Sequence, residues 1–432
     1  MKFSQVAVIA WAALVFLICG CGDVFRPVAT PLPQPSPDPQ TFRLAVMTAC
    51  ELSAGTTTCN PAGVSSQVSD VNVSGDTVEG VVPVGRSPMF ALVQNSGVIA
   101  AVTTADFDND TVSQHTDSHL TSPPSVSAVT TVGLPQGAHP ISLGTANGSL
   151  YVAELGRSVV GVIAGFPLAL TTEIPVGANP VNLAVLPNGK NIYVVNRGDG
   201  TVTVISAADN SVVTTIPVGS TPVWAVASSD SSRVYVVNQG SGTVSVVDAT
   251  SNTVIAAVPV GSSPNYAVFD PKNQRVLVTN PGSNTVSVIN ADPTSPAFKN
   301  VSSVTVGSNP VSVAALPDGT RVYVANAGSN SVSVINSLSL TVSKTISLAS
   351  SATKNPLDVS PVPVWIAADP QNTKVFTANR DARDASVINT SNDSEVTDAS
   401  GVPVRIPAPN ADPTCAGNTC ARLSPVFIAV GG

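Results

Sequence analysis

The side chains best suited to chemistry are densest in one stretch, ADFDNDTVSQHTDSH, residues 105–119. Asp106, Asp108 and Asp110 have the alternating spacing of an oxygen-ligand calcium loop, and His115 and His119 could serve a transition metal. We favour a simpler interpretation, because residues 110–112 align with residues 200–202 and the aspartates would then form the turn before a strand. Two histidines four positions apart on a strand lie about 13 Å apart, too far to share a metal. We therefore expect no metal and no cofactor.

The rest of the chain lacks the motifs of catalysis. Its three histidines are His115, His119 and His139, and it contains no HExxH, Walker A, GxSxG or GxGxxG motif. No CxxCH segment is present for covalent haem attachment. We assign no catalytic residues and expect a protein that binds rather than one that catalyses.

The charge balance argues against nucleic acid as a partner. The formal net charge is −8, and only 11% of the residues are charged. Binding to nucleic acid or to anionic lipid needs clustered Lys and Arg, which the sequence does not show. We therefore expect contact with a membrane only through a lipid anchor.

The N-terminus resembles a bacterial lipoprotein signal. Lys2 precedes an uncharged apolar stretch over residues 6–18, which has the length of a secretory signal and is short for a membrane span. Residues 18–21, Ile-Cys-Gly-Cys, resemble a lipobox and make Cys21 the predicted lipidation site. An ordinary signal peptide with an incidental cysteine is the alternative. We expect residues 1–20 to be removed and the chain to be anchored in the bacterial cell envelope, facing the periplasm or the exterior.

A proline-rich segment follows the predicted anchor. Residues 21–41 hold prolines at positions 27, 31, 33, 35, 37 and 39. Such a segment prefers extended polyproline II and serves as a semi-rigid spacer. We therefore predict a lipidated linker over 21–41 and one folded domain over 42–432.

Four cysteines remain after the predicted cleavage: Cys50, Cys59, Cys415 and Cys420. An even number in an oxidising compartment indicates disulfides, with three possible connectivities. We favour Cys50 with Cys59 and Cys415 with Cys420, because each pair brackets a short polar loop. The alternative is a cross-pairing between the two ends of the domain, which would close a far longer loop.

The folded domain consists of repeats. Residues 180–221 align with residues 222–263 without a gap, and each unit contains four apolar-alternating runs separated by turn residues. Four strands in 40 to 45 residues is typical of a propeller blade. Prolines 175, 217 and 259 fall inside the fourth run, which predicts an edge strand. The first run supplies small residues, as expected near the axis: Ala184, Ala225, Ala267 and Ala314.

Asparagines 196, 238, 280 and 326 end the second run of four units. They lead into glycine-containing turns, where positive φ and local side-chain hydrogen bonds are needed. These segments, such as Tyr193-Val194-Val195-Asn196 and Tyr235-Val236-Val237-Asn238, resemble the YVTN family of β-propeller repeats, as do Val278-Thr279-Asn280 and the recurring Val-Gly-x-x-Pro. The resemblance covers roughly residues 80–390 and implies a cell-surface propeller. The relatives of that family include periplasmic oxidoreductase subunits and lactonase-like propellers, so the resemblance implies a fold and a compartment more than a reaction.

The anchoring proline of each repeat gives the blade count. It occurs eight times, as Pro88, Pro140, Pro180, Pro222, Pro264, Pro310, Pro363 and Pro425. The last repeat is too short for a blade, and residues 43–84 supply the three missing strands. We predict an all-β propeller of eight four-stranded blades, closed by pairing between N- and C-terminal strands. Seven blades is the alternative, if residues 43–84 or 364–424 do not form a full blade.

Aromatic residues recur two positions after the anchoring proline. Five of the eight sites hold one, namely Phe90, Trp224, Tyr266, Trp365 and Phe427, while the others hold Ser142, Asn182 and Ser312. Two interpretations stay open. The aromatics pack between blades, or they form a partial ring at the channel mouth that stacks on a ligand. The longest loops are predicted to gather at the nearby end of the channel, which favours that end for binding.

The leading functional hypothesis is an anchored binding or scaffold module for an envelope protein or glycan, acting as a monomer. A periplasmic lactonase-like hydrolase or lyase is one alternative. An accessory subunit of a periplasmic redox complex is another.

Overall fold

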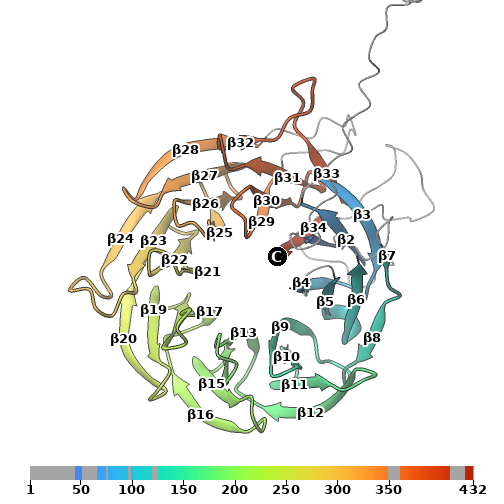
Figure 1. Cartoon of the computed structure of the whole chain (residues 1–432). Coiled ribbons are helices and arrows are strands. Elements are labelled where there is room, and N and C mark those ends of the chain that lie inside the picture. Colours follow the sequence, from blue (N-terminus) through green and yellow to red (C-terminus); the bar gives the residue numbers. More distant parts are fainter. Residues whose placement is uncertain are drawn as a thin grey trace, which may run out of the picture. The chain divides into compact units, whose positions relative to one another are not determined.

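Eight antiparallel sheets surround a central axis and form the blades of a β-propeller (Figure 1). The computed structural model describes residues 44–50, 66–73, 76–95, 99–118, 125–348, 361–408 and 424–431. All of these belong to one compact unit over residues 40–432. The prediction of eight blades is confirmed, and the seven-blade alternative is wrong.

Blades 3 to 7 each take four consecutive strands, which run outward from the axis in chain order (Figure 1). Blade 3 has β9 (Pro140–Ala146), β10 (Ser149–Glu154), β11 (Val159–Ala164) and β12 (Ala169–Pro175). Blade 4 has β13 (Pro180–Val185), β14 (Asn191–Asn196), β15 (Thr201–Ser206) and β16 (Val212–Pro217). Blade 5 has β17 (Pro222–Ala227), β18 (Arg233–Asn238), β19 (Thr243–Asp248) and β20 (Thr253–Pro259). Blade 6 has β21 (Tyr266–Asp270), β22 (Arg275–Asn280), β23 (Thr285–Asn290) and β24 (Val301–Thr305). Blade 7 has β25 (Pro310–Ala315), β26 (Arg321–Asn326), β27 (Ser331–Asn336) and β28 (Thr341–Ser347).

Blades 2 and 8 have a divided outer strand. Blade 2 consists of β4 (Pro88–Asn95), β5 (Ile99–Asp106) and β6 (Thr111–Ser118), with the short helix η2 (Phe107–Asn109) between the last two and with β7 (Ser125–Val126) and β8 (Thr130–Gly133) both paired to β6. Blade 8 consists of β29 (Pro363–Ala368), β30 (Lys374–Asn379) and β31 (Asp384–Asn389), with β32 (Ser394–Glu395) and β33 (Arg405–Pro407) both paired to β31. Residues 364–424 therefore do contribute a full blade.

Blade 1 closes the ring as predicted. Its strands are β34 (Ser424–Gly431), β1 (Leu44–Cys50), β2 (Ser66–Asn72) and β3 (Thr77–Pro83), from the axis outward. β1 pairs with β2 on one side and with β34 on the other, with Leu44 opposite Gly431. Strands from the two ends of the domain therefore share one sheet, and the ring has no open edge.

The expected positions of the prolines and alanines are confirmed. Prolines 175, 217 and 259 end the outermost strands β12, β16 and β20, where no neighbouring strand needs the missing N–H. Alanines 184, 225, 267 and 314 are buried on the innermost strands. The sequence of the repeat thus predicts which strand lies at the axis and which lies at the outer edge.

The asparagines that end the second strands are buried linkers rather than turn residues. The Asn238 amide donates hydrogen bonds to the hydroxyls of Thr243, at 3.2 Å, and Ser245, at 2.9 Å, and the other repeats show the same pattern. The expected local hydrogen bonds are confirmed. The positive φ expected in the turns falls four residues after each asparagine, at Gly200, Gly242, Asn284 and Asn330.

The same asparagine explains the glycine of the Val-Gly-x-x-Pro motif. A Cβ on Gly219 would lie 2.6 Å from Cγ of Asn238, and a Cβ on Gly307 would lie 2.6 Å from Cγ of Asn326. The asparagine belongs to the blade that follows the glycine. This close approach locks neighbouring blades together and excludes any side chain.

Tyrosines on the second strands link each blade to the next. The Tyr151 hydroxyl donates to Oδ1 of Asn210 at 2.7 Å, and the Tyr193 hydroxyl donates to Oδ1 of Asn252 at 2.6 Å. The Tyr323 hydroxyl likewise donates to Asp393. Each acceptor lies in the turn between the third and fourth strands of the next blade.

Candidate functional site

The five aromatic residues singled out by their position lie on the innermost strands of blades 1, 2, 5, 6 and 8. In four of these strands the pairing register shifts between the anchoring proline and the aromatic residue, as between Pro222 and Trp224. Such a bulge bends the strand and re-aims the side chain that follows it. The bulge can therefore direct the side chain at this position of the repeat into the channel.

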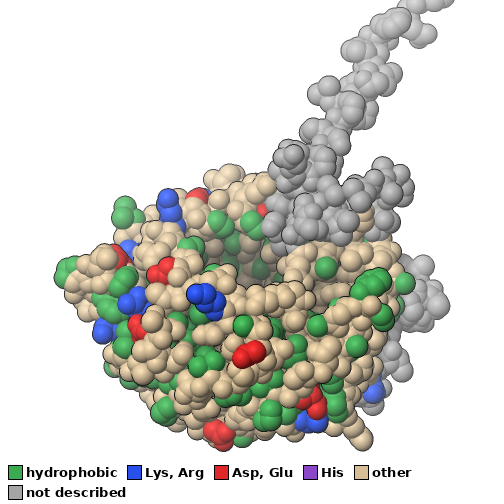
Figure 2. Space-filling model, turned by 60° about the horizontal axis from the view of Figure 1, so that its bottom comes forward, with side chains coloured by type: hydrophobic (Ala, Val, Ile, Leu, Met, Phe, Trp, Pro, Cys, Tyr) green, Lys and Arg blue, Asp and Glu red, His purple; other side chains and the backbone are tan. Residues whose placement is uncertain are grey.

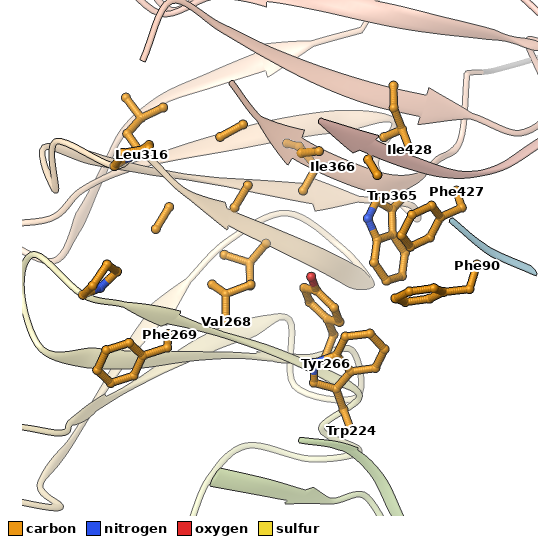
Figure 3. A pocket seen from close by; sticks show the side chains of 18 residues that line it. Phe90, Trp224, Tyr266, Val268, Phe269, Leu316, Trp365, Ile366, Phe427 and Ile428 are labelled. Atoms are coloured by element: carbon orange, nitrogen blue, oxygen red, sulfur yellow. The ribbon is translucent and has the colours of Figure 1, made fainter. Parts of the chain in front are cut away.

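The five rings form one continuous cluster across the channel, which we call the aromatic cluster. Ring centroids are 4.9 Å apart for Phe90 and Phe427, 4.5 Å for Phe427 and Trp365, and 4.8 Å for Trp365 and Tyr266. Trp224 lies 4.7 Å from Tyr266 and 6.0 Å from Trp365. Trp224 and Trp365 come from blades 5 and 8, so the rings meet across the axis rather than only between neighbours (Figure 3).

The three polar residues at the same position bridge adjacent blades. Oγ of Ser142 accepts a hydrogen bond from the backbone N–H of Leu183, and Oδ1 of Asn182 accepts one from Ala225, at 3.2 and 2.9 Å. Oγ of Ser312 accepts from Ile366 at 3.4 Å. Because Ser312 is small, the rings of blades 6 and 8 can touch past blade 7. One position of the repeat thus has two uses, an aromatic in the channel or a polar bridge in the wall.

A cavity of about 410 Å³ is bounded by the aromatic cluster and by the inner strands of blades 6, 7, 8 and 1 (Figure 3). Its other walls are apolar: Val268, Phe269, Pro271, Val313, Ala314, Ala315, Leu316, Pro317, Ile366, Ala367, Ala368, Ile428 and Ala429. A second cavity of about 470 Å³ continues along blades 4, 5 and 6 and shares Trp224, Tyr266, Val268, Phe269 and Pro271 with the first. Together they form what we call the channel cavity. Figure 2 shows the centre of the propeller hollowed, with hydrophobic side chains inside.

The channel cavity runs from the aromatic cluster toward the turns between first and second strands. The lining residues begin two positions after the anchoring proline and reach Pro187, Pro271 and Pro317, seven positions after it. This end of the channel is opposite to the one at which the longest loops are predicted to gather. The long loops at 349–360 and 409–423 lie outside the described residues, and their role stays a prediction.

The packing interpretation of the aromatic residues is confirmed in part, and stacking on a ligand stays a prediction. Phe90 and Trp365 pack against the buried cores of blades 1, 2 and 8, and Phe427 is only 5% exposed. The Trp224, Tyr266 and Trp365 side chains are nevertheless half-buried and line the channel cavity. The cluster is thus packed on one side and open on the other.

The electrostatics of the channel cavity are those of an apolar site with a few donors. Among the described residues that line it, none is charged, and Tyr266 is the only one with an ionisable side chain. Burial raises the pKa of the Tyr266 hydroxyl, which therefore stays protonated. The arrangement can stack and donate hydrogen bonds, but it offers no carboxylate or imidazole for acid–base chemistry.

The aspartates considered as calcium ligands have separate structural partners. Asp106 is fully buried and accepts hydrogen bonds from the hydroxyls of Thr104, at 2.8 Å, and Ser113, at 2.5 Å. Asp108 accepts from Ser87, and Asp110 accepts from the backbone N–H groups of Gly137 and His139, at 2.7 and 2.8 Å. Within the described part of the chain, no group of three or more His, Cys, Asp or Glu side chains could hold a metal ion.

Sequence reasoning missed a buried contact between an imidazole and a carboxylate that joins blades 1 and 2. Nε2 of His115 on β6 lies 2.7 Å from Oδ2 of Asp70 on β2, and both side chains are buried. Burial raises the pKa of Asp70, and the hydrogen bond to His115 opposes that shift. No sequence signal pairs these residues, because Asp70 lies in the most degenerate blade. His119 lies outside the described residues.

Another group of carboxylates surrounds Arg157 in blade 3. Glu154 occupies the place that asparagine takes in other repeats, and burial raises its pKa to about 7. The Arg157 guanidinium lies 3.0 Å from Glu154 and also bonds Glu173. Neither this group nor the pair of His115 and Asp70 lines the channel cavity, because these residues lie on or beyond the second strands of their blades.

The predicted covalent features can be placed only in part. Cys50 ends β1 and is disulfide-bonded. Cys59, Cys415 and Cys420 lie outside the described residues, as does Cys21, so the connectivity and the lipidation stay predictions. Of the helices in the described ranges, none is both long and apolar enough to cross a bilayer.

Solved structures share the propeller fold at low sequence identity. Apo AztD from Citrobacter koseri is 11% identical, with 90% of this chain and 98% of that chain covered and a TM-score of 0.61. Dihydro-heme d1 dehydrogenase NirN, in complex with DHE, is 12% identical over 91% of this chain and 75% of that chain, with a TM-score of 0.62. Hydrazine synthase from Kuenenia stuttgartiensis is 18% identical over 70% and 96%, with a TM-score of 0.54. At these identities the likeness concerns the fold alone.

Sequence comparison adds a local similarity. No curated protein matches the chain. The family described as "Lactonase, 7-bladed beta-propeller" matches residues 277–414, which include part of blade 6 and all of blades 7 and 8. This match covers less than half of the chain, and the propeller here has eight blades. The chain is therefore an eight-bladed β-propeller that is similar, over these residues, to the lactonase-type propellers.

Proposed function

We propose that this chain is a binding module of the bacterial cell envelope that holds its ligand in the channel cavity against the aromatic cluster. The observation that carries the proposal is the convergence of five rings from five blades on one cavity. Aromatic rings packed on one side and open on the other are suited to hold a ligand by stacking and apolar contact.

A lactonase-like hydrolase is the second candidate, because the family match over residues 277–414 favours it. The lining of the channel cavity does not support hydrolysis, since none of its described residues is a carboxylate or an imidazole. The enzyme would be favoured over the binding module if the purified chain hydrolysed simple lactones and lost this activity on substitution of one of its Asp or Glu residues. We expect no such activity.

Attachment to the envelope is part of the proposal and rests on the Ile-Cys-Gly-Cys sequence. Substitution Cys21→Ala should move the chain from the detergent phase to the aqueous phase on Triton X-114 partitioning. The same shift should follow inhibition of the lipoprotein signal peptidase. Unchanged partitioning in both experiments would contradict the anchor.

Photo-cross-linking from inside the channel tests the binding function. Ser229 is exposed and lines the cavity near its mouth, and Val213 is 49% exposed on the outer strand of blade 4. A photoreactive amino acid at Ser229 should give adducts in intact cells, whereas the same residue at Val213 should not.

The matched variant replaces two rings with a residue type that the repeat already carries at this position. Trp224→Ser and Trp365→Ser give the aromatic position the side chain found at Ser142 and Ser312, which bridges adjacent blades. The double variant should stay folded by circular dichroism and lose the adduct at Ser229. An adduct that persists in a folded double variant would refute binding at the aromatic cluster.

A further inference from the structure

We propose that the ligand of the channel cavity is a neutral, largely apolar small molecule that presents a hydrogen-bond acceptor, such as a ketone or ester carbonyl. This inference rests on the proposed function and names the class of ligand for the same site. It is argued from the side chains of the cavity wall, from their charge and from their hydrogen bonds.

The polar groups of the aromatic cluster are donors. They are the indole N–H groups of Trp224 and Trp365 and the hydroxyl of Tyr266, and indole nitrogen can only donate. In Figure 3 the Tyr266 hydroxyl points into the space enclosed by the lining side chains. Burial alone accounts for the raised pKa of Tyr266, and no described residue accepts a hydrogen bond from its hydroxyl. A donor that faces the cavity and has no partner in the protein is free to bond an acceptor on the ligand.

The rest of the wall excludes charged ligands. The described lining residues include no Lys, Arg or His to pair with an anion and no Asp or Glu to pair with a cation. An ion that leaves water for an apolar site without a partner of opposite charge loses far more than its apolar contacts return. The ligand is therefore neutral.

The wall also disfavours a glycan, one of the two partner classes that the sequence leaves open. A sugar carries several hydroxyls, each of which needs an acceptor when buried. Apart from Ser229 near the mouth and the Tyr266 hydroxyl, the described lining side chains offer no oxygen to receive them. Protein sites that bind sugars need such partners beside the stacking rings, because unpaired buried hydroxyls weaken binding.

Size agrees with a small molecule. The two connected parts of the cavity measure about 410 and 470 Å³. These volumes lie in the range of ordinary small-molecule sites, about 300 to 1,000 Å³. Their walls are mostly Val, Ala, Leu, Ile and Pro, which supply contact area for an apolar skeleton while the rings supply the donors.

The tryptophans make the test direct. The chain has three, and Trp11 lies in the predicted signal, so Trp11→Phe leaves Trp224 and Trp365 as the only tryptophans. Both lie in the aromatic cluster, and their emission excited at 295 nm therefore reports on the cavity alone. The probes are 1-acetyladamantane, its hydrocarbon analogue 1-isopropenyladamantane, adamantane-1-carboxylate and maltohexaose. Isothermal titration gives the dissociation constants.

The ketone should bind about 2- to 10-fold more tightly than the hydrocarbon, the range of one net hydrogen bond. The carboxylate should bind at least about 100-fold more weakly than the ketone, because its charge has no partner. Tyr266→Phe, which keeps the ring, should abolish the advantage of the ketone and leave the hydrocarbon unchanged. Tyr193→Phe, outside the cavity, is the matched control and should preserve both affinities.

The outcomes separate this inference from the proposed function. If maltohexaose or the carboxylate binds as tightly as the ketone, the ligand class is wrong and binding in the channel stands. If no probe binds while cross-linking from Ser229 still depends on the tryptophans, the class is again wrong and the function stands. If no probe binds and cross-linking does not depend on the tryptophans, both proposals fail.

Discussion

Asp106 offers the sharpest test of how the repeat works. It occupies in blade 2 the place that asparagine takes in blades 4 to 8, at the end of the second strand. Its carboxylate accepts hydrogen bonds from Thr104, Thr111 and Ser113. In blade 8 the equivalent Asn379 accepts from Thr377 and donates to Asp384 and Ser386. Asp106→Asn should therefore fit the site with a full set of hydrogen bonds and no buried charge.

The pKa gives the size of the effect. Burial raises the pKa of Asp106 from its ordinary 3.8 to about 6. That difference corresponds to about 3 kcal/mol, since one pKa unit is about 1.4 kcal/mol. Between these two values the folded state holds the proton more tightly than the unfolded state, so stability falls as the pH rises. Above pH 6 the full cost of the buried charge is present, and below pH 3.8 it vanishes.

Asp106→Asn should thus raise the free energy of unfolding by about 3 kcal/mol at pH 7 and by only about 1 kcal/mol at pH 4.5. Urea denaturation of both proteins at the two pH values measures this difference, in which the other titrating groups cancel. Asn238→Asp, the reciprocal change, should destabilise at pH 7 and less so at pH 4.5. A stabilisation that does not depend on pH, or none at all, would refute the electrostatic reasoning.

Three further predictions concern the contacts between blades. Tyr193→Phe should lower the free energy of unfolding by about 1 kcal/mol, because the hydrogen bond to Asn252 is lost. Tyr235→Phe should leave stability unchanged or raise it, because the buried Tyr235 hydroxyl has no partner among the described residues. Thermal denaturation compares the two variants, and equal losses of stability would contradict this account. Gly219→Ala should cost about 1 to 3 kcal/mol because its Cβ would meet Asn238, while Gly133→Ala, with open space around its Cβ, should change stability by less than about 0.5 kcal/mol. His115→Ala should cost about 3 to 5 kcal/mol, because the Asp70 carboxylate would stay buried without the imidazole, and His139→Ala on the half-exposed surface should cost less than about 1 kcal/mol in the same urea titration.

Much of the fold could be predicted because each repeat encodes its own geometry. The prolines of the fourth run mark the outer edge, and the anchoring prolines count the blades. Ring closure followed from arithmetic, since the last repeat needed three strands that only residues 43–84 could supply. The repeat also singled out the aromatic position, because five rings at equivalent sites stand out in a chain with 4% aromatic residues.

The rest of the site could not be predicted, because its signals depend on contacts between blades. The apolar lining, such as Val268 and Ile366, shows the same alternation as residues buried between blades. The end of the channel that holds the cavity depends on how far the rings of Trp224 and Trp365 reach across the axis. The partner of His115 is in another blade, 45 positions earlier in the chain, where no pattern of spacing could reveal it.

The pairing of β1 with β34 sets the order in which the molecule can be assembled. Leu44 lies opposite Gly431, so the last sheet cannot be completed until nearly the whole domain has been synthesised. Contacts between such distant residues form slowly, because a long loop must close before they give any stabilisation. Until then β1 presents an unpaired edge, which can pair with the edge of another copy. Passage across a membrane in an extended state, followed by folding on the far side, would keep chains apart during this vulnerable interval.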